Sequence, residues 1–158
     1  MALEVSYSAV ISACEKGELC ELGLSLMLEM LCARLMPNVI SYSATVCACG
    51  KGHQSQRALS MMQEMRYSDL RLNLVSYNAT ISTCSKCQFC EQAQCLMREM
   101  QGAGLEAGVI SYNSTISACE KGQPCGRALS FLREMRCLRL ESDVISYSAA
   151  ISACEKGS

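Results

Sequence analysis

A short segment that ends in serine and tyrosine recurs along the chain at a constant distance. Its fullest copies read Val-Ile-Ser-Tyr, and a shorter copy opens the chain. The tyrosines stand 35 residues apart, at Tyr7, Tyr42, Tyr77, Tyr112 and Tyr147. A period of this size is the signature of a solenoid, in which each unit buries its apolar face against its neighbours. The repeat therefore constrains the fold before any single helix is assigned.

The first half of the repeat reads as a helix. In the second copy, Tyr42, Val46 and Cys49 follow the spacing i, i+4, i+7, which places them on one helical face. Ser41 stands just before this pattern and is expected to be the N-cap. The segment 50–52, Gly-Lys-Gly, then breaks the pattern, which predicts a tight turn between two helices.

The second half of the unit reads as another helix. From Gln54 onward, apolar residues again follow the spacing i, i+4, i+7, at Ala58, Met62 and Met65. Each repeat is therefore a helical hairpin, and the chain is predicted to be an all-α solenoid of nine helices. We expect the hairpins to stack into a right-handed superhelix whose first helices line the concave face.

The repeats are expected to form a single continuous array. Its approximate units are 4–38, 39–73, 74–108 and 109–143, followed by a partial unit at 144–158. The partial unit supplies only a first helix, and an isolated helix this short would be marginal in water. We expect it to pack on the fourth unit, and its uncapped face to favour self-association or a continuation of the array.

The thirteen cysteines follow the repeat and not the pattern of a secreted disulfide framework. One column recurs at the repeat distance, at Cys14, Cys49, Cys84, Cys119 and Cys154. A cysteine that recurs at one helical position behaves as a small buried hydrophobe, so this column is expected to be buried. All thiols are expected to be reduced in an intracellular protein. Exposed cysteines are expected in the loops, at Cys32 and Cys137.

One cysteine cluster has the composition of a thiolate metal site. Four thiolates can hold zinc or an iron–sulfur cluster, and the chain offers Cys84, Cys87, Cys90 and Cys95. Cys84 and Cys90, however, belong to repeat columns that occur elsewhere without such partners. We therefore expect no metal and no cofactor.

No catalytic constellation is recognisable in the sequence. There are no paired carboxylates, no phosphate-binding loop and no nucleophile motif. The lone His53 lies in a predicted turn and is expected to be exposed. The chain is therefore not expected to be an enzyme.

Charge and hydropathy narrow the possible partners only in part. The formal net charge is −1, from 14 basic and 15 acidic side chains, which neither requires nor excludes a nucleic acid. No apolar run reaches the roughly 18 residues of a membrane span, so no membrane partner is expected. The start of the chain shows neither a signal peptide nor a transit peptide. We expect the chain to be a piece of a longer array.

Two stretches of the fourth unit carry a family resemblance. Residues 111–122 read Ser-Tyr-Asn-Ser-Thr-Ile-Ser-Ala-Cys-Glu-Lys-Gly, and residues 127–135 read Arg-Ala-Leu-Ser-Phe-Leu-Arg-Glu-Met. Together with the period, these columns resemble the pentatricopeptide repeat along the whole chain. The resemblance implies binding of single-stranded RNA, with one base per repeat. It also implies a chloroplast or mitochondrial protein that acts in RNA processing, stability or translation.

The resemblance implies which side chains read the bases. In the family they are the residue after the repeat tyrosine and the last residue of the same repeat. The implied pairs are Ser8 with Asn38, Ser43 with Asn73, Asn78 with Gly108, and Asn113 with Asp143, and Ser148 begins a fifth. An aliphatic residue two positions before the tyrosine wedges against the base, at Val5, Ile40, Val75, Ile110 and Ile145. By the family's pairing rules, units one to four should prefer A-A-N-U.

A column of lysines ends the first helices, at Lys16, Lys51, Lys86, Lys121 and Lys156. A regular row of cations suits contact with a phosphate backbone. Solvated lysines also favour a helix C-terminus, and the short polar residues of the base-reading columns also serve as helix caps and turns. Both interpretations stay open for both columns.

Two other functions stay open as well. A tetratricopeptide-like scaffold that binds a protein or peptide is favoured by the near-neutral charge, although large aromatic and arginine anchors are missing. A degenerate fragment without activity is the third possibility. Salt-sensitive binding to RNA homopolymers distinguishes an RNA partner from a protein partner.

Overall fold

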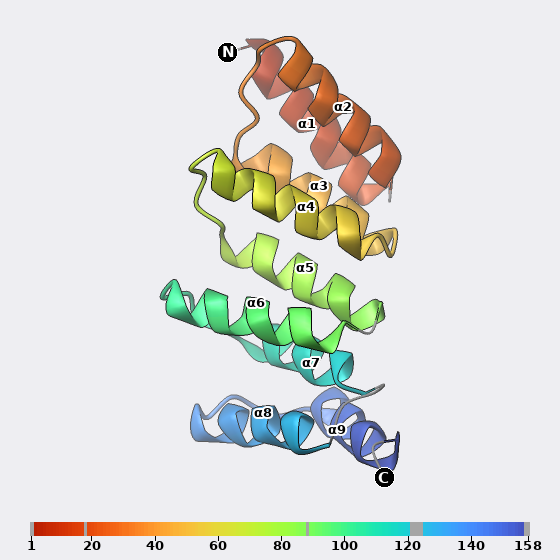
Figure 1. The fold of residues 1–158 in the computed structure, drawn as a ribbon, viewed down its shortest axis with the longest axis vertical. Helices are drawn as coiled ribbons and strands as arrows, with labels where there is room; N and C mark the ends of the chain where they lie inside the picture. Colours follow the sequence, from red (N-terminus) through yellow and green to blue (C-terminus); the bar gives the residue numbers. More distant parts are fainter. Residues whose placement is uncertain (1, 18, 88, 121–124, 157–158) are drawn as a thin grey trace. The chain divides into compact units, whose positions relative to one another are not determined.

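The computed structural model describes residues 2–17, 19–87, 89–120 and 125–156, and within these ranges it is all-α (Figure 1). The helices are α1 (Ala2–Lys16), α2 (Cys20–Cys32), α3 (Val39–Lys51), α4 (Ser55–Tyr67), α5 (Leu74–Lys86), α6 (Cys90–Gly102), α7 (Val109–Ala118), α8 (Gly126–Cys137) and α9 (Val144–Lys156). First and second helices of successive repeats alternate along the described ranges. The predicted all-α class and the helical hairpins are confirmed.

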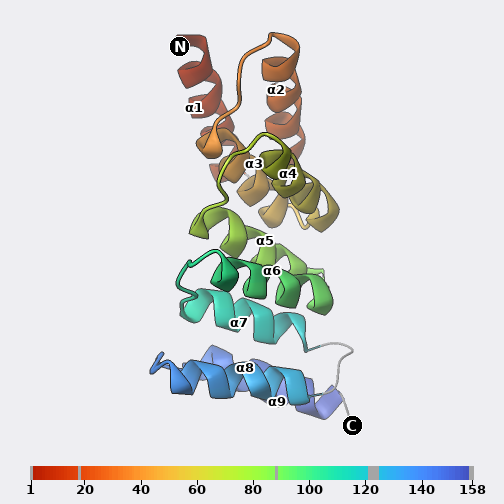
Figure 2. The same cartoon turned by 60° about the vertical axis from the view of Figure 1, so that its left-hand side comes forward.

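The chain divides into two compact units, residues 1–83 and 84–158, which are described separately. In the first unit, α1 packs against α2 and α3, and α3 packs against α4 (Figures 1 and 2). In the second unit, α7 packs against α6, α8 and α9, and α8 also packs against α9. Within each unit, consecutive repeats therefore meet through their first helices, as in a solenoid.

A side-chain cap starts three of the first helices, α3, α5 and α9, and in α3 it precedes the predicted cap. Before α3, Oδ1 of Asn38 accepts a hydrogen bond from the backbone N–H of Ser41, at 3.0 Å. Asn73 and Asp143 accept in the same way from residues three further on, at 2.9 Å each. The prediction that Ser41 is the N-cap is therefore wrong. The helix begins at Val39, so the serine is the third helical residue, whose N–H the cap satisfies.

Each second helix ends in the same left-handed turn. After α2, Arg34 adopts a φ of 56°, and the N–H of Leu35 bonds to the carbonyl of Met30 at 2.9 Å. This is the hydrogen bond of a Schellman motif, in which the sixth residue also packs back on the helix. The same bond recurs at 2.9–3.1 Å from Leu70 to Met65, from Leu105 to Met100 and from Leu140 to Met135. The left-handed position recurs at Asp69, Gly104 and Arg139.

Gly50 lies inside α3, so the predicted Gly-Lys-Gly turn is wrong in its first half. A β-carbon at Gly50 would stand 2.5 Å from Oγ1 of Thr83 and 3.3 Å from the carbonyl oxygen of Ala79. The glycine is needed because the next first helix approaches too closely for any side chain. The chain reverses instead around His53, which has a φ of 57° and is exposed, as predicted.

Methionine, cysteine and small aliphatic residues fill much of the core. Four members of the predicted cysteine column are buried, at Cys14, Cys49, Cys84 and Cys119. Cys154 is only half-buried, so the prediction is wrong for this member. Its helix, α9, packs against α7 and α8 in the described ranges and leaves Ile151 exposed. Cys32 and Cys137 are exposed, as predicted, but each is the last residue of a helix, α2 or α8, so their predicted place in the loops is wrong.

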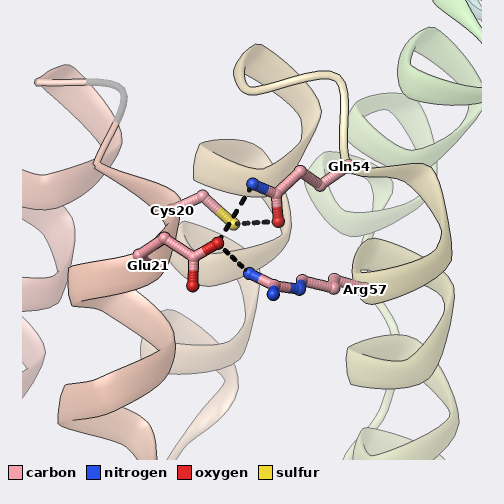
Figure 3. Close-up of polar contacts among 4 residues, drawn as sticks. All are labelled: Cys20, Glu21, Gln54 and Arg57. Carbon is pink, nitrogen blue, oxygen red and sulfur yellow. Dashed lines mark hydrogen bonds and ion pairs between the residues drawn. The ribbon is translucent and has the colours of Figure 1, made fainter.

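Polar contacts join neighbouring second helices in the first unit (Figure 3). Arg57 near the start of α4 forms an ion pair with Glu21 near the start of α2, and its hydrogen bond lowers the pKa of the Glu21 carboxyl. Gln54 precedes α4, donates to Glu21 at 3.4 Å and accepts from the thiol of Cys20 at 3.5 Å. Because the ion pair is exposed, it adds little to stability and mainly supports the alignment of the two helices.

Candidate nucleic-acid interface

The predicted base-reading residues gather where one first helix follows another. The residues after the tyrosines lie in the early turns of α1, α3 and α7, at Ser8, Ser43 and Asn113. Their predicted partners immediately precede the next first helix, at Asn38, Asn73 and Asp143. The stacking of first helices therefore brings together residues that are distant in sequence.

The first pair is joined through a third residue. The Oγ atoms of Ser8 and Ser41 are 2.8 Å apart, and the Ser41 hydroxyl donates to Oδ1 of Asn38 at 3.2 Å. Ser41 is fully buried and Ser8 exposes only 7% of its surface, whereas Asn38 is exposed. The amide is therefore the more accessible member of this pair.

The second pair repeats this arrangement. The Oγ atoms of Ser43 and Ser76 are 2.8 Å apart, and the Ser76 hydroxyl donates to Oδ1 of Asn73 at 3.1 Å. Ser76 is fully buried, like its counterpart in the first pair. The two pairs are thus built from the same residue types in the same hydrogen-bonded order.

The fourth pair is in direct contact. Nδ2 of Asn113 donates to both carboxylate oxygens of Asp143, at 3.1 and 3.3 Å. The buried hydroxyl of Ser146 contacts both members, through Oδ1 of Asn113 and Oδ1 of Asp143. Hydrogen bonds from the Ser146 N–H and hydroxyl, and from Asn113, lower the pKa of the Asp143 carboxyl. The pair therefore presents an ionised acceptor beside an amide donor at neutral pH.

The remaining predicted base-reading residues are less defined by the structure. Asn78 lies in the first compact unit and Gly108 in the second, and Gly108 offers no side chain. Ser148 is exposed in α9, and its hydroxyl donates to the carbonyl of Val144 in the same helix. The pairs that these residues are predicted to form are therefore not described by side-chain contacts as the other three are.

The predicted wedge residues are exposed at every repeat. Between 56% and 69% of each side chain is accessible, at Val5, Ile40, Val75, Ile110 and Ile145. Each stands three residues before the first member of a predicted pair. An exposed aliphatic side chain beside a short polar pair offers an apolar surface next to hydrogen-bonding groups, which suits a flat, polar-edged ligand.

The lysines of the repeated column have different surroundings. Lys51 donates through Nζ to the carbonyl oxygen of Glu15 at 2.9 Å, so it satisfies the end of the neighbouring helix α1. Lys16 and Lys86 are exposed at the ends of α1 and α5. Lys121 and the side chain of Lys156 lie outside the described residues. Lys51 thus contacts the carbonyl end of a neighbouring helix, and contact of the lysine column with phosphate stays a prediction.

The serines between the pair members were missed by sequence reasoning. We call Ser41, Ser76 and Ser146 the bridging serines. The signal was present, because the residue before every repeat tyrosine is a serine, at Ser6, Ser41, Ser76, Ser111 and Ser146. From the sequence alone, a serine at this position predicts only a helix cap.

Sequence models of known families match most of the chain. A pentatricopeptide repeat domain model matches residues 25–87 and 95–156, and a single-repeat model matches residues 5–35 and 75–105. The chain belongs to the pentatricopeptide repeat family. No curated protein sequence matches it significantly.

Solved pentatricopeptide repeat structures share the fold. The protein PPR10 in complex with an 18-nt psaJ RNA element superposes with a TM-score of 0.75 at 20% identity, over 95% of this chain and 22% of that one. A structure of PPR10 from maize gives 0.53 at 21% identity, over 97% of this chain and 27% of that one. The repeat domain of Arabidopsis thaliana protein-only RNase P 1, in complex with tRNA, gives 0.81 at 11% identity, over 96% and 80%. The chain thus spans about a fifth of the PPR10 chain in the first complex.

The described residues lack two features, a metal-binding cluster and a membrane-spanning helix. No three His, Cys, Asp or Glu side chains in these ranges gather closely enough to hold a metal ion. None of the described helices has the length and apolar character that crossing a membrane requires.

Proposed function

We propose that this pentatricopeptide repeat chain binds single-stranded RNA in a sequence-specific manner, with one base per repeat. The observation that carries the proposal is the repeated placement of an exposed aliphatic side chain beside a short polar pair. Two of the similar structures are RNA complexes, which supports the same conclusion. Family membership favours a role in RNA processing, stability or translation in a chloroplast or mitochondrion.

The proposed contacts divide between stacking and hydrogen bonding. A base that leaves its own stack needs an apolar surface, and the exposed residues Val5, Ile40 and Ile110 offer one in their repeats. The polar pair then reads the edge of the base, because each base presents its own pattern of donors and acceptors. We further propose that all repeats form one array, so that successive pairs read successive bases.

The pairs define an RNA sequence. Ser8 with Asn38 and Ser43 with Asn73 favour adenine, and Asn113 with Asp143 favours uracil, by the pairing rules of the family. Asn78 with Gly108 defines no base. With the N-terminus at the 5′ end of the RNA, the preferred sequence is A-A-N-U.

The variant Asp143→Asn tests the proposal at the fourth base. Replacing the carboxylate by an amide adds a donor, so the preference is expected to shift from uracil towards cytosine. Competition binding with A-A-C-U and A-A-C-C oligonucleotides at fixed salt measures this shift, which is expected to be at least about fivefold. Asp69→Asn is the matched control, because Asp69 is exposed in a loop and its substitution removes the same negative charge.

The outcomes separate two kinds of failure. If wild type and Asp143→Asn both bind but do not distinguish the two RNAs, the polar columns act only as helix caps. If the wild type shows no salt-sensitive RNA binding at all, the chain is not an RNA-binding array.

A hollow on the second helices favours a protein partner as the alternative. It has a volume of about 420 Å³ between α2 and α4, with an apolar lining that includes Leu24, Leu28, Leu31 and Met61. Leu28 and Leu31 are 63% and 45% exposed. Helix α2 therefore presents apolar surface that its own packing does not cover. A protein partner that binds without salt-sensitive RNA binding would favour this alternative.

A further inference from the structure

A buried hydroxyl stands between the two members of three base-reading pairs. We propose that the bridging serines Ser41, Ser76 and Ser146 are positioning residues for base specificity, because they fix which polar atoms each pair turns towards a base. The inference rests on the proposed function and deepens it. The serines act through their neighbours and touch no base themselves.

In the first pair, the single proton of the Ser41 hydroxyl decides the direction of the hydrogen bonds. The Ser41 hydroxyl donates to Oδ1 of Asn38 at 3.2 Å, and a hydroxyl has only one proton to donate. The 2.8 Å contact between Ser8 and Ser41 therefore has Ser8 as the donor. The proton of Ser8 therefore points towards Ser41, and its oxygen can only accept a hydrogen bond from any further partner.

The same bonds fix the amide of Asn38. Its Oδ1 accepts from the backbone N–H and from the hydroxyl of Ser41, at 3.0 and 3.2 Å. The exposed side chain therefore offers its Nδ2 donor to a ligand. One donor beside one acceptor complements the edge of adenine, whose ring nitrogen accepts and whose amino group donates.

The second pair has the same polarity. The Ser76 hydroxyl donates to Oδ1 of Asn73 at 3.1 Å, and the Ser76 N–H donates to the same oxygen at 2.9 Å. The 2.8 Å contact with Ser43 therefore has Ser43 as the donor. The two adenine-type pairs thus have the same buried support.

In the fourth pair, the serine at the same repeat position supports an amide and a carboxylate in place of a hydroxyl and an amide. The single proton of the buried Ser146 hydroxyl lies between Oδ1 of Asn113 and Oδ1 of Asp143, and Nδ2 of Asn113 is directed at the carboxylate of Asp143. A carboxylate acceptor held beside an amide donor complements uracil, whose N3–H donates and whose carbonyl oxygens accept. One buried hydroxyl therefore orients both kinds of pair.

The variant Ser76→Ala tests the inference at the second base. It removes the acceptor of the Ser43 proton and one of the two bonds to Oδ1 of Asn73. Fluorescence anisotropy with A-A-C-U and A-C-C-U oligonucleotides at fixed salt measures the preference for adenine. We expect about tenfold preference in the wild type and about twofold in the variant. Ser76→Thr keeps the hydroxyl and is expected to keep the preference.

Ser111→Ala is the matched control. It removes a buried hydroxyl from the same repeat position, but the corresponding partner, Gly108, has no side chain to orient. It is expected to keep the preferences at the second and fourth bases. Thermal melts followed by circular dichroism establish that each variant is folded at the assay temperature.

The outcomes are distinct. Loss of the preference for adenine at the second base in Ser76→Ala, with the preference kept in Ser111→Ala, supports the inference. Wild-type preference in folded Ser76→Ala overturns the inference and leaves the proposed function standing, whereas no preference in the wild type overturns both. If Ser76→Ala unfolds at the assay temperature, Ser146→Ala decides in its place, read at the fourth base with A-A-C-U and A-A-C-C.

Discussion

Single hydroxyls and thiols in this chain have roles set by burial. The bridging serines are fully buried, so each of their hydrogen bonds has a definite partner and direction. Four cysteines of the repeat column, all but Cys154, occupy similarly buried positions but carry a weak donor, so they serve mainly as small apolar side chains. The same repeat therefore contains a polar buried column that orients other groups and an apolar one that fills space.

The buried thiols are predicted to be slow nucleophiles. Burial raises the pKa of Cys90 to about 12 and that of Cys84 to about 11. Because only the thiolate reacts, both should be alkylated far more slowly at about pH 8 than the exposed Cys32 and Cys137. A short iodoacetamide pulse followed by peptide mass spectrometry gives the order of labelling. Equal rates for Cys84 and Cys32 would contradict the assignment.

The same pKa shift fixes the direction of a pH effect on stability. The folded-state pKa of Cys90 lies above the value of about 8.5 for an unfolded thiol. The folded chain therefore holds this proton more tightly, and the contribution is complete below about pH 8.5 and is lost as the pH rises towards 12. The free energy of unfolding in urea is expected to decrease over this range.

At the scale of helices and their connections, one backbone position distinguishes the repeats. The turn after the second helix needs a left-handed residue, which is Gly104 in one repeat and Arg139 in the next. A non-glycine residue costs about 1–2 kcal/mol in this conformation, partly offset because glycine is more flexible in the unfolded chain. The repeats thus differ in local strain although their hydrogen bonds are alike.

A pair of reciprocal variants tests this point. Arg139→Gly is expected to raise the free energy of unfolding, and Gly104→Arg to lower it, each by about 0.5–1 kcal/mol. Both positions lie in the same compact unit and are exposed, so packing changes are small. Urea unfolding of the two variants and the wild type supplies the measurement. Shifts of the same sign would show that the turn conformation is not what limits stability.

The helices themselves were predictable, whereas their exact starts and contacts were not. The recurring tyrosine, alanine and methionine columns identify the apolar face of each helix, which is local information. Ser41 and Asn38 are both good cap residues, and only the backbone start at Val39 decides between them. From the sequence alone, Gly50 predicts a turn. The glycine is required instead by the close approach of Thr83, which belongs to the next repeat.

The candidate site shows the same limit. Membership in a pair could be expected from the family register, but the hydrogen-bonded order could not. The bridge from Ser8 through Ser41 to Asn38 depends on how two helices stack, which no spacing within one repeat reveals. Wedge residues such as Ile40 and Ile110 are exposed, and their contact with a base stays a prediction.

At the scale of the whole molecule, function depends on repetition. Three of the four complete repeats contribute a polar pair and each repeat has an exposed aliphatic side chain, and in the proposed function a single pair would discriminate bases only weakly. The chain spans 22% of the length of PPR10 in its RNA complex, so the proposed array would contact few bases and is expected to bind with modest affinity. The proposed array therefore gains specificity from the fixed order of its pairs.

Selection from a pool of RNAs with a randomised central segment tests the central claim most directly. The wild-type chain is incubated with the pool at fixed salt, and the bound RNAs are sequenced. Enrichment of A-A-N-U, with tolerance at the third position, is the result that one base per repeat predicts. Binding without any position-specific preference, or enrichment of a motif that no register of one base per repeat can match, would contradict it.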